Sequence, residues 1–182
     1  MRAIETITGR VSTLMRDDID TDQIIPKQFL KRVERTGFGE FLFHEWRANG
    51  YDLPKNPILV AGENFGSGSS REHAPWALMD YGFRALISPR FADIFRNNCT
   101  KNGVLPIELP KEQCRAIAER GHARVDLEAQ TVDEFSFEID PEVKRRLLNG
   151  LDDISLTLQQ VELIDAYEAE RERVGPVTNA LA

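Results

Sequence analysis

The segment that most constrains the fold is a glycine- and serine-rich stretch at residues 62–75, which reads GENFGSGSSREHAP. An unbroken apolar run at residues 57–61 precedes it and predicts a buried strand. A helix is expected to follow at residues 74–81, because Gly82 is a natural C-terminal cap. Glycines let the backbone approach a ligand closely, and a helix N-terminus presents unpaired N–H groups that suit an anion. By its chemistry the stretch is an anion-binding turn.

The chain beyond this turn alternates between strands and helices. An apolar strand is expected at residues 85–88, a helix at residues 90–97 and a third strand at residues 104–109. Pro106 cannot donate to a sheet ladder, so the third strand is expected at an edge. The alternation predicts an α/β layer.

The remaining elements are expected on either side of this block. Before it, residues 4–14 predict one strand or two strands around Gly9, and residues 41–47 predict a short helix or a packed loop. After it, we expect a helix at residues 111–120 and a hairpin of residues 125–128 with 132–139. Two further helices are expected at residues 141–149 and at about 158–173. The last helix is expected to begin at a capping box of Thr157 and Gln160, and the tail from about residue 175 to be frayed.

The composition fits one globular domain that spans residues 1–182. Hydrophobic residues make up 41% of the chain and charged residues 29%, and a domain of this size buries roughly 70% of the surface that its unfolded chain exposes. The formal net charge is −7 and the pI is near 5.1. Such an acidic chain offers no basic surface to a phosphate backbone, so nucleic acid and anionic membranes are poor candidate partners.

Two cysteines, Cys99 and Cys114, are too few for a disulfide scaffold or for a cysteine-ligated metal centre held by this chain alone. No apolar run reaches 18 residues, and residues 1–10 carry charges with no apolar stretch between them. The sequence therefore predicts neither a membrane span nor a signal peptide, and we expect a cytoplasmic protein.

Familiar phosphate-binding and nucleophile motifs do not match the turn. A dinucleotide fingerprint needs a glycine where Arg71 stands, a Walker loop needs Gly-Lys-Ser/Thr, and no Gly-x-Ser-x-Gly elbow surrounds the serines. A structural alternative stays open, in which Ser69 and Glu72 form a capping box. Pro75 weighs against it, because a proline six residues past the cap would cost about 3 kcal/mol inside the helix. Either the helix begins near residue 74 or its first turn is irregular.

The run Gly-x-Gly-Ser-Ser-Arg-Glu-His at residues 66–73 resembles the swivel domain of the aconitase superfamily, a swivelling β/β/α domain of the α/β class. FADIFRNNC at residues 91–99 and GVLP at residues 103–106 carry the same resemblance. Upstream, DTDQIIP at residues 20–26 and Trp46 after an aromatic stretch are similar to free-standing small subunits of the 3-isopropylmalate dehydratase type. The resemblance covers nearly the whole chain.

This resemblance implies a two-chain hydro-lyase of leucine biosynthesis. Members of the superfamily dehydrate a hydroxy acid that carries several carboxylates and rehydrate it with the hydroxyl moved. Here 2-isopropylmalate and 3-isopropylmalate would interconvert through isopropylmaleate. The Lewis acid is expected to be an open iron of a [4Fe–4S] cluster on the large subunit, with no metal or cofactor bound by this chain. The implied partners are that iron–sulfur subunit and a small dicarboxylate.

The resemblance also implies roles for residues of the turn. Ser69 aligns with the catalytic base, Arg71 with an arginine that binds a substrate carboxylate, and Ser70 and Gly68 with neighbouring substrate-binding positions. A serine hydroxyl is a poor base at neutral pH, so the helix N-terminus and the Arg71 guanidinium are expected to stabilise its alkoxide. Asn64, Glu72 and His73 are expected to support these residues, His73 through a hydrogen bond rather than by proton transfer.

The three aspartates of residues 18–22 are spaced like the first ligands of a calcium loop, but the glycine and the glutamate that complete an EF-hand are absent. A solvated acidic turn is one interpretation. The resemblance implies another, in which Thr21 and Asp22 lie beside the substrate and Asp22 orients Arg71 or a substrate hydroxyl.

Five residues of the following stretch are expected to set specificity: Ile24, Ile25, Lys31, Arg32 and Arg35. Ile25 stands where aconitases have a polar residue, which fits a substrate with an isopropyl group in place of a carboxylate. One of the three cations is expected to contact substrate, and each is also explained as an exposed charge.

Other functions stay open at this point. The chain is also compatible with the small subunit of a sister dehydratase that acts on homoaconitate, citraconate or dimethylmalate. It is compatible as well with a non-catalytic anion-binding module, or with an interaction protein in which the turn only caps a helix.

Overall fold

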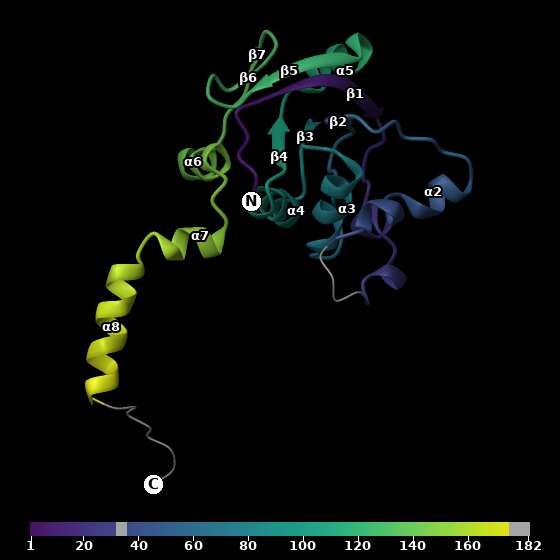
Figure 1. Ribbon diagram of the computed structural model, residues 1–182. Coiled ribbons are helices and arrows are strands. Elements are labelled where there is room, and N and C mark those ends of the chain that lie inside the picture. Colours follow the sequence, from purple (N-terminus) through teal and green to yellow (C-terminus); the bar gives the residue numbers. More distant parts are fainter. Residues whose placement is uncertain (32–35, 175–182) are drawn as a thin grey trace.

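The computed structural model describes residues 1–31 and 36–174 and shows one sheet with helices on both of its faces (Figure 1). Within those residues, the strands join in the order β4-β3-β2-β1-β5-β6-β7. Strands β1 to β4 pair in parallel, and β5 to β7 continue the sheet in antiparallel pairs. The strands are β1 (Thr6–Leu14), β2 (Ile58–Ala61), β3 (Ala85–Ser88), β4 (Leu105–Glu108), β5 (His122–Asp126), β6 (Thr131–Val132) and β7 (Phe135–Ser136).

Helices form the connections between the parallel strands. Helix α3 links β2 to β3, α4 links β3 to β4, and α5 links β4 to the antiparallel β5. The helices are α1 (Thr21–Ile24), α2 (His44–Ala48), α3 (His73–Tyr81), α4 (Asp93–Asn102), α5 (Lys111–Arg120), α6 (Pro141–Asn149), α7 (Asp153–Leu158) and α8 (Val161–Val174), with the 3-10 helices η1 (Lys27–Phe29) and η2 (Phe38–Phe41).

Side chains of the parallel strands alternate between two hydrophobic cores, one on each face of the sheet. Leu59 and Ala61 of β2 pack with side chains of α3, α4 and the aromatic segment at residues 38–43. Ile58 and Val60 pack with side chains of α5 and α6. A strand covered on both faces needs an unbroken apolar run, which is what the sequence has at this place. The predicted α/β layer is confirmed.

Two expectations for the strands are settled by the pairing. β4 lies at the edge of the sheet, as Pro106 predicts. The N-terminal segment forms a single strand through Gly9, which pairs with Ala123 of β5. A Cβ added at Gly9 would stand 2.5 Å from the Pro57 side chain, so glycine serves a close approach here rather than a break.

The prediction of one strand over residues 132–139 is wrong. The chain turns after β6 and returns as the two-residue strand β7. Asp133 makes the turn with a positive φ of 51°, and its side chain accepts a hydrogen bond from the Arg124 backbone N–H at 2.9 Å. A short polar side chain that satisfies the backbone locally favours a turn over a continued strand.

The predicted capping box of Thr157 and Gln160 is also wrong. Thr157 lies inside α7, where its hydroxyl donates to the Asp153 carbonyl at 3.0 Å. Asp152 caps that helix instead, because its carboxylate accepts from the Ser155 backbone N–H at 2.8 Å. The last helix therefore begins at Val161, and the tail expected to fray lies outside the described residues.

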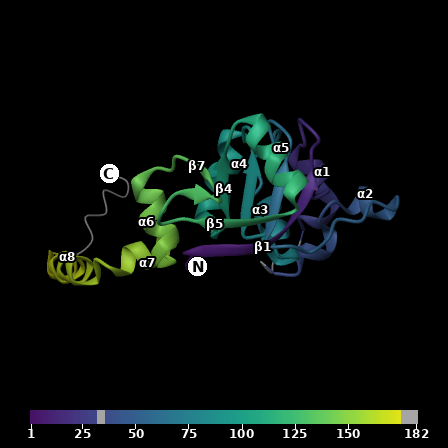
Figure 2. The same cartoon turned by 90° about the horizontal axis from the view of Figure 1, so that it is seen from above.

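Helices α7 and α8 lead the chain away from the sheet, and α8 stands apart from it in both views (Figures 1 and 2). No helix among the described residues is long and apolar enough to span a membrane.

Candidate active site

The candidate site lies where the chain leaves the carboxyl ends of β1 and β2, two neighbouring parallel strands. The segments that follow these strands run side by side. The Gly66 N–H donates to the Ile19 carbonyl at 2.7 Å, and the Thr21 N–H donates to the Ser67 carbonyl at 2.9 Å. In open α/β sheets, ligands bind outside the carboxyl ends of the strands. The topology therefore places the glycine turn where a ligand site is expected.

Two glycines shape the turn for different reasons. Gly66 has a φ of 82°, and a Cβ added there would stand 2.1 Å from the Phe95 ring. Gly68 has a φ of 87°, but a Cβ there would meet only ordinary contacts, the nearest at 3.5 Å from Asp20. Gly66 thus allows the turn to pack on α4, whereas Gly68 supplies a left-handed backbone on the exposed side.

Arg71 and Asp22 form a two-pronged ion pair at the centre of the site. Arg71 Nη1 donates to Asp22 Oδ1 at 2.6 Å, and Nη2 donates to Oδ2 at 2.9 Å. The Arg71 side chain is 8% exposed and that of Asp22 is 42% exposed. The hydrogen bonds from Arg71 lower the pKa of Asp22, so the carboxylate is charged at neutral pH. A fork of this kind fixes the plane of the guanidinium.

Each of the three aspartates in residues 18–22 has its own hydrogen-bond partner, and Asp18 is also exposed. Asp18 accepts from the Asn64 side-chain amide at 2.8 Å. Asp20 caps α1 in a complete capping box, accepting from the Gln23 N–H at 2.7 Å and donating its own N–H to the Gln23 side chain at 3.0 Å. Asp22 holds Arg71. The box of Asp20 fixes the start of α1, whose first turn carries Asp22.

Ser69 does not cap α3, so the structural alternative for the turn is wrong. Glu72 occupies the capping position without a side-chain hydrogen bond, and the helix begins at His73. Pro75 is then the third helical residue, where the missing N–H has no partner to lose. The Thr21 hydroxyl donates to the Ser69 carbonyl at 3.0 Å and so holds the turn instead. The Ser69 hydroxyl has no hydrogen-bond partner among the described residues.

The residues immediately on the N-terminal side of Arg71 in the turn lie on the surface of the protein. Gly68, Ser69 and Ser70 are all exposed, next to the buried Arg71. The turn therefore presents exposed polar groups to solvent.

The residues expected to set specificity are not gathered at one surface. Ile24 and Ile25 are fully buried in the core that contains α3, so their side chains support the loop from inside. Lys31 is exposed. Arg32 and Arg35 lie outside the described residues.

Asn64, Glu72 and His73 surround the turn in different ways. Asn64 binds Asp18, and Glu72 is exposed. The His73 ring packs against the rings of Phe38 and Trp76, with centroids 5.2 and 4.8 Å away. Burial lowers the pKa of His73 below its ordinary value of 6.5, so the ring is neutral at pH 7. Its supporting role through a hydrogen bond stays a prediction.

Lys27 is a candidate that sequence reasoning missed. Its Nζ lies 3.8 Å from Asp22 Oδ2, and its side chain is 74% exposed. It stands directly after Pro26, at the start of η1, and precedes the three cations expected to contact substrate. Its position five residues after Asp22 was the only available signal.

Comparison with known proteins identifies the family to which this turn belongs. The family model for the aconitase C-terminal domain matches residues 1–57 and 48–112, and the model for the C-terminal domain of the 3-isopropylmalate dehydratase small subunit matches residues 153–176. The 3-isopropylmalate dehydratase small subunit of Halalkalibacterium halodurans is 54% identical, over 94% of this chain and 100% of that protein. The small subunit of Bacillus subtilis is 48% identical, over 94% of this chain and 97% of that protein.

The chain belongs to the 3-isopropylmalate dehydratase small-subunit family. A crystal structure of 3-isopropylmalate dehydratase from Methanocaldococcus jannaschii has the same fold, with a TM-score of 0.70 at 27% identity, over 90% of this chain and 99% of that chain. The resemblance to the aconitase swivel domain is therefore confirmed in both sequence and fold. As a member of the small-subunit family, the chain is one component of a hydro-lyase that works with a large subunit.

The side chains of this chain that could bind a metal do not fit an iron–sulfur cluster. Cys99 and Cys114 lie buried on α4 and α5. Burial raises the pKa of both thiols, that of Cys114 to about 11. Across residues 1–31 and 36–174, no three or more His, Cys, Asp and Glu side chains are grouped to hold a metal ion. A cluster needs several accessible thiolates, which these two buried cysteines do not provide.

Proposed function

We propose that this chain is the small subunit of a cytoplasmic hydro-lyase that interconverts 2-isopropylmalate and 3-isopropylmalate through isopropylmaleate, in leucine biosynthesis. Membership in the small-subunit family supports the reaction. The observation that carries the site is the fork between Arg71 and Asp22 beside the exposed Ser69. Those residues come from two segments that only the parallel sheet brings together.

In this proposal Ser69 is the base of the dehydration. Its Oγ takes a proton from the carbon next to a carboxylate, the electron pair of that C–H bond becomes the second bond of the alkene, and hydroxide leaves the neighbouring carbon. A serine alkoxide needs strong stabilisation at neutral pH. The N-terminal N–H groups of α3 and the Arg71 guanidinium lie in the same turn and are suited to supply it. The absence of a cap bond leaves the Ser69 hydroxyl available for this task.

Arg71 is proposed to hold a substrate carboxylate while it stays bound to Asp22. The fork with Asp22 occupies one N–H on each terminal nitrogen, which leaves three of the five guanidinium N–H groups. Those are enough for a second carboxylate with two parallel bonds. Gly68 and Ser70 are proposed to contact the same substrate, since both are exposed beside Arg71. Thr21 is proposed to act with them from a buried position, where its hydroxyl donates to the Ser69 carbonyl at 3.0 Å.

Lys27 is proposed to supply positive charge at the site, because the carboxylate of Asp22 neutralises that of Arg71. Asp22 and Arg71 together are neutral, and a dicarboxylate substrate needs net positive charge around it. Lys27 adds that charge at a distance of 3.8 Å from the Asp22 carboxylate. Because its side chain is largely exposed, it is free to turn toward a ligand.

We place the Lewis acid, a [4Fe–4S] cluster, on the large subunit. The donors of this chain do not fit such a cluster, and the family resemblance implies it on the partner. Bound there, such a cluster would supply Lewis-acid chemistry for the leaving hydroxide. The exposed turn of this chain is then one half of the active site.

The experiment that tests the function is reconstitution with the large subunit from the same organism under anaerobic conditions. The full chain and the large subunit are purified together, and hydration of isopropylmaleate is followed by the loss of its alkene absorbance. We expect turnover by the pair and none by either chain alone.

Other alkenes decide between this proposal and its alternatives. If the pair hydrates only the alkenes of the homoaconitate, citraconate or dimethylmalate reactions, the sister dehydratase is the correct function. If a stable pair hydrates none of them, the chain is a binding module and the proposal is wrong.

A further inference from the structure

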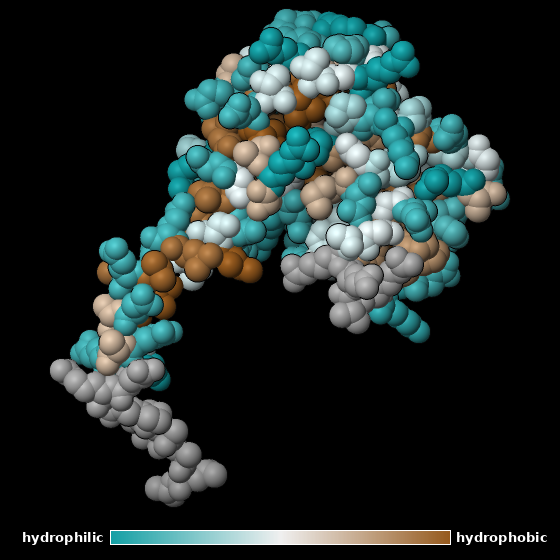
Figure 3. Space-filling model, viewed as in Figure 1, coloured by the Kyte–Doolittle hydropathy of each residue, from teal (hydrophilic) through white to brown (hydrophobic). Residues whose placement is uncertain are grey.

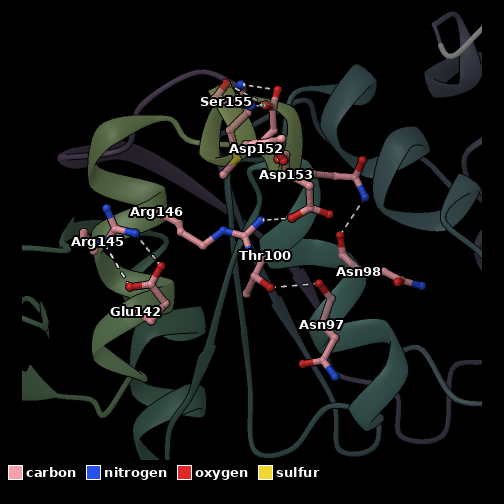
Figure 4. Close-up of polar contacts among 12 residues, drawn as sticks. Asn97, Asn98, Thr100, Glu142, Arg145, Arg146, Asp152, Asp153 and Ser155 are labelled. Atoms are coloured by element: carbon pink, nitrogen blue, oxygen red, sulfur yellow. Dashed lines mark hydrogen bonds and ion pairs between the residues drawn. The ribbon is translucent and has the colours of Figure 1, made fainter. Parts of the chain in front are cut away.

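The C-terminal arm, defined here as residues 153–171 of α7 and α8, is fixed at its base and uncovered along its length. Figure 4 shows the base, where Arg146 of α6 donates to Asp153 at 2.5 Å and Asp152 accepts from the Ser155 hydroxyl at 2.7 Å. These contacts set the direction in which the arm leaves the sheet. Beyond them, every side chain of α8 up to Arg171 is exposed except the half-buried Ile164.

Apolar side chains gather on this arm to a degree found nowhere else on the described surface. Five of the seven exposed large hydrophobic side chains lie on it: Ile154 at 72%, Leu158 at 61%, Val161 at 45%, Leu163 at 70% and Tyr167 at 58%. Ile154 with Leu158, and Leu163 with Tyr167, stand four residues apart, so each pair lies on one face of its helix. Figure 3 shows the hydrophobic colour over α7 and the start of α8. Single exposed apolar residues are ordinary, but a contiguous set marks an interaction surface.

The arm also lacks the means to be stable by itself. An isolated helix of about 14 residues is marginal in water even with favourable residues, and most helices are stabilised by packing one face against other structure. Helix α8 packs almost nothing against the rest of this chain. Its stability therefore depends on a surface that another molecule provides.

The charges around the apolar residues indicate what that surface is like. Within residues 161–171 of α8, Glu162, Asp165, Glu168 and Glu170 accompany the pair of Leu163 and Tyr167, and Arg171 is the basic residue of that stretch. Arg171 is occupied at Tyr167, where it donates to the phenol oxygen at 2.5 Å. The complementary surface is an apolar strip bordered by lysines and arginines.

We propose that the arm docks on the large subunit of the dehydratase, in an apolar groove with a basic rim. This inference rests on the proposed function, because it needs a large subunit. A second copy of this chain is the weaker candidate, since two acidic arms of a chain with net charge −7 would repel each other. The family model that is specific to dehydratase small subunits covers residues 153–176, so the arm belongs to the family whose partner is a separate chain.

The test compares two glutamate substitutions on the same helix in the full chain. Leu163→Glu places a charge in the apolar face. Ala169→Glu introduces the same charge on another face, because Ala169 is exposed and lies two residues after Tyr167. Dissociation constants with the purified large subunit are measured by calorimetry, and far-UV circular dichroism checks that both variants are folded.

We expect Leu163→Glu to weaken binding by about 10- to 100-fold and Ala169→Glu by less than about threefold. At saturating large subunit, both pairs are expected to keep the turnover number of the wild type, because the arm lies away from Ser69. Equal affinity of the two variants would overturn the proposal. So would concentration-dependent dimerisation of the isolated chain that Leu163→Glu abolishes, since the occupant would then be a second copy.

The results also separate this inference from the function on which it rests. Normal affinity of Leu163→Glu together with normal hydration of isopropylmaleate would refute the docking arm alone. Weakened affinity in a pair whose wild type hydrates none of the alkenes would refute the enzymatic function and leave the docking arm in place.

Discussion

Replacement of Arg71 by lysine separates the catalytic use of the fork from its contribution to stability. Arg71 makes two charged contacts with Asp22, at 2.6 and 2.9 Å, and a lysine ammonium at this place is able to keep only one of them. A hydrogen bond to a charged group in a buried site contributes about 1.5–3 kcal/mol. Because the Asp22 side chain is 42% exposed, solvent screening reduces the loss to about 1 kcal/mol. For a chain of this length that lowers Tm by about 2–4 °C.

The effect on turnover is expected to be much larger than the effect on stability. Lysine does not offer the planar fork that holds a second carboxylate in one orientation. Loss of one preorganised donor for developing charge costs about 10²–10³ in rate. We therefore expect kcat/KM for Arg71→Lys to fall by about 10²–10³, with KM raised and kcat lowered, while the chain stays folded and assembled.

The assay is the initial rate of isopropylmaleate hydration by the reconstituted pair, with Tm measured on the same samples. Arg120→Lys is the matched control, because Arg120 also binds carboxylates through both terminal nitrogens, at Asp133 and Glu134, and does not belong to the turn. Its kcat/KM is expected to stay within about twofold of the wild type. Unchanged KM and kcat in Arg71→Lys, or an equal loss in Arg120→Lys, would refute the reasoning.

Five further substitutions are expected to have distinct effects. Ser69→Ala abolishes turnover by the pair but leaves Tm unchanged, since the hydroxyl has no described partner to lose. Gly66→Ala lowers the free energy of unfolding by about 3 kcal/mol, and Gly121→Ala by about 1 kcal/mol, because only the first Cβ collides with a ring. Lys27→Gln raises KM about threefold with kcat unchanged. His73→Phe reduces the gain in stability between pH 5 and 7, because burial lowers the pKa of His73 below 6.5 and stability is lost as pH falls through that range.

Each of these expectations has a contrary result. Near-normal turnover of Ser69→Ala would remove the base assignment, and equal losses in the two glycine variants would show that the ring contact is unimportant. Lys101 is an exposed lysine on α4. If Lys101→Gln raised KM as much as Lys27→Gln does, the effect of Lys27 would be one of overall charge and not of position. An unchanged pH profile of unfolding in His73→Phe would mean that another group titrates there.

Local sequence signals predicted the parallel block well because few other structures satisfy them. The run at residues 57–61 has no polar position to face water, so it had to be a strand covered on both faces. Pro106 removed a donor that only an edge strand is able to spare. Such rules refer to single elements and hold wherever those elements are placed.

Capping signals were less reliable, because a cap competes with tertiary contacts. The capping boxes expected at Ser69 with Glu72 and at Thr157 with Gln160 are not formed, whereas Asp20 and Gln23 form one. At Ser69 the backbone is taken up by the Thr21 hydroxyl, and at Thr157 the helix had already begun behind Asp152. The same four-residue pattern therefore has different outcomes in different surroundings.

By itself the sequence determined the α/β class, the glycine turn between β2 and α3 and, through its motifs, the family. The pattern of residues alone left Asp22 in an acidic turn, and only the resemblance suggested that it orients Arg71. Tertiary structure decided that these two side chains meet, although they stand 49 positions apart in the chain. The physical reason is the parallel pairing of β1 and β2, which brings their carboxyl ends to one edge of the sheet. Rules about neighbouring residues do not predict a contact across that separation. They do not predict the exposure of the arm either, because it depends on how the rest of the chain packs.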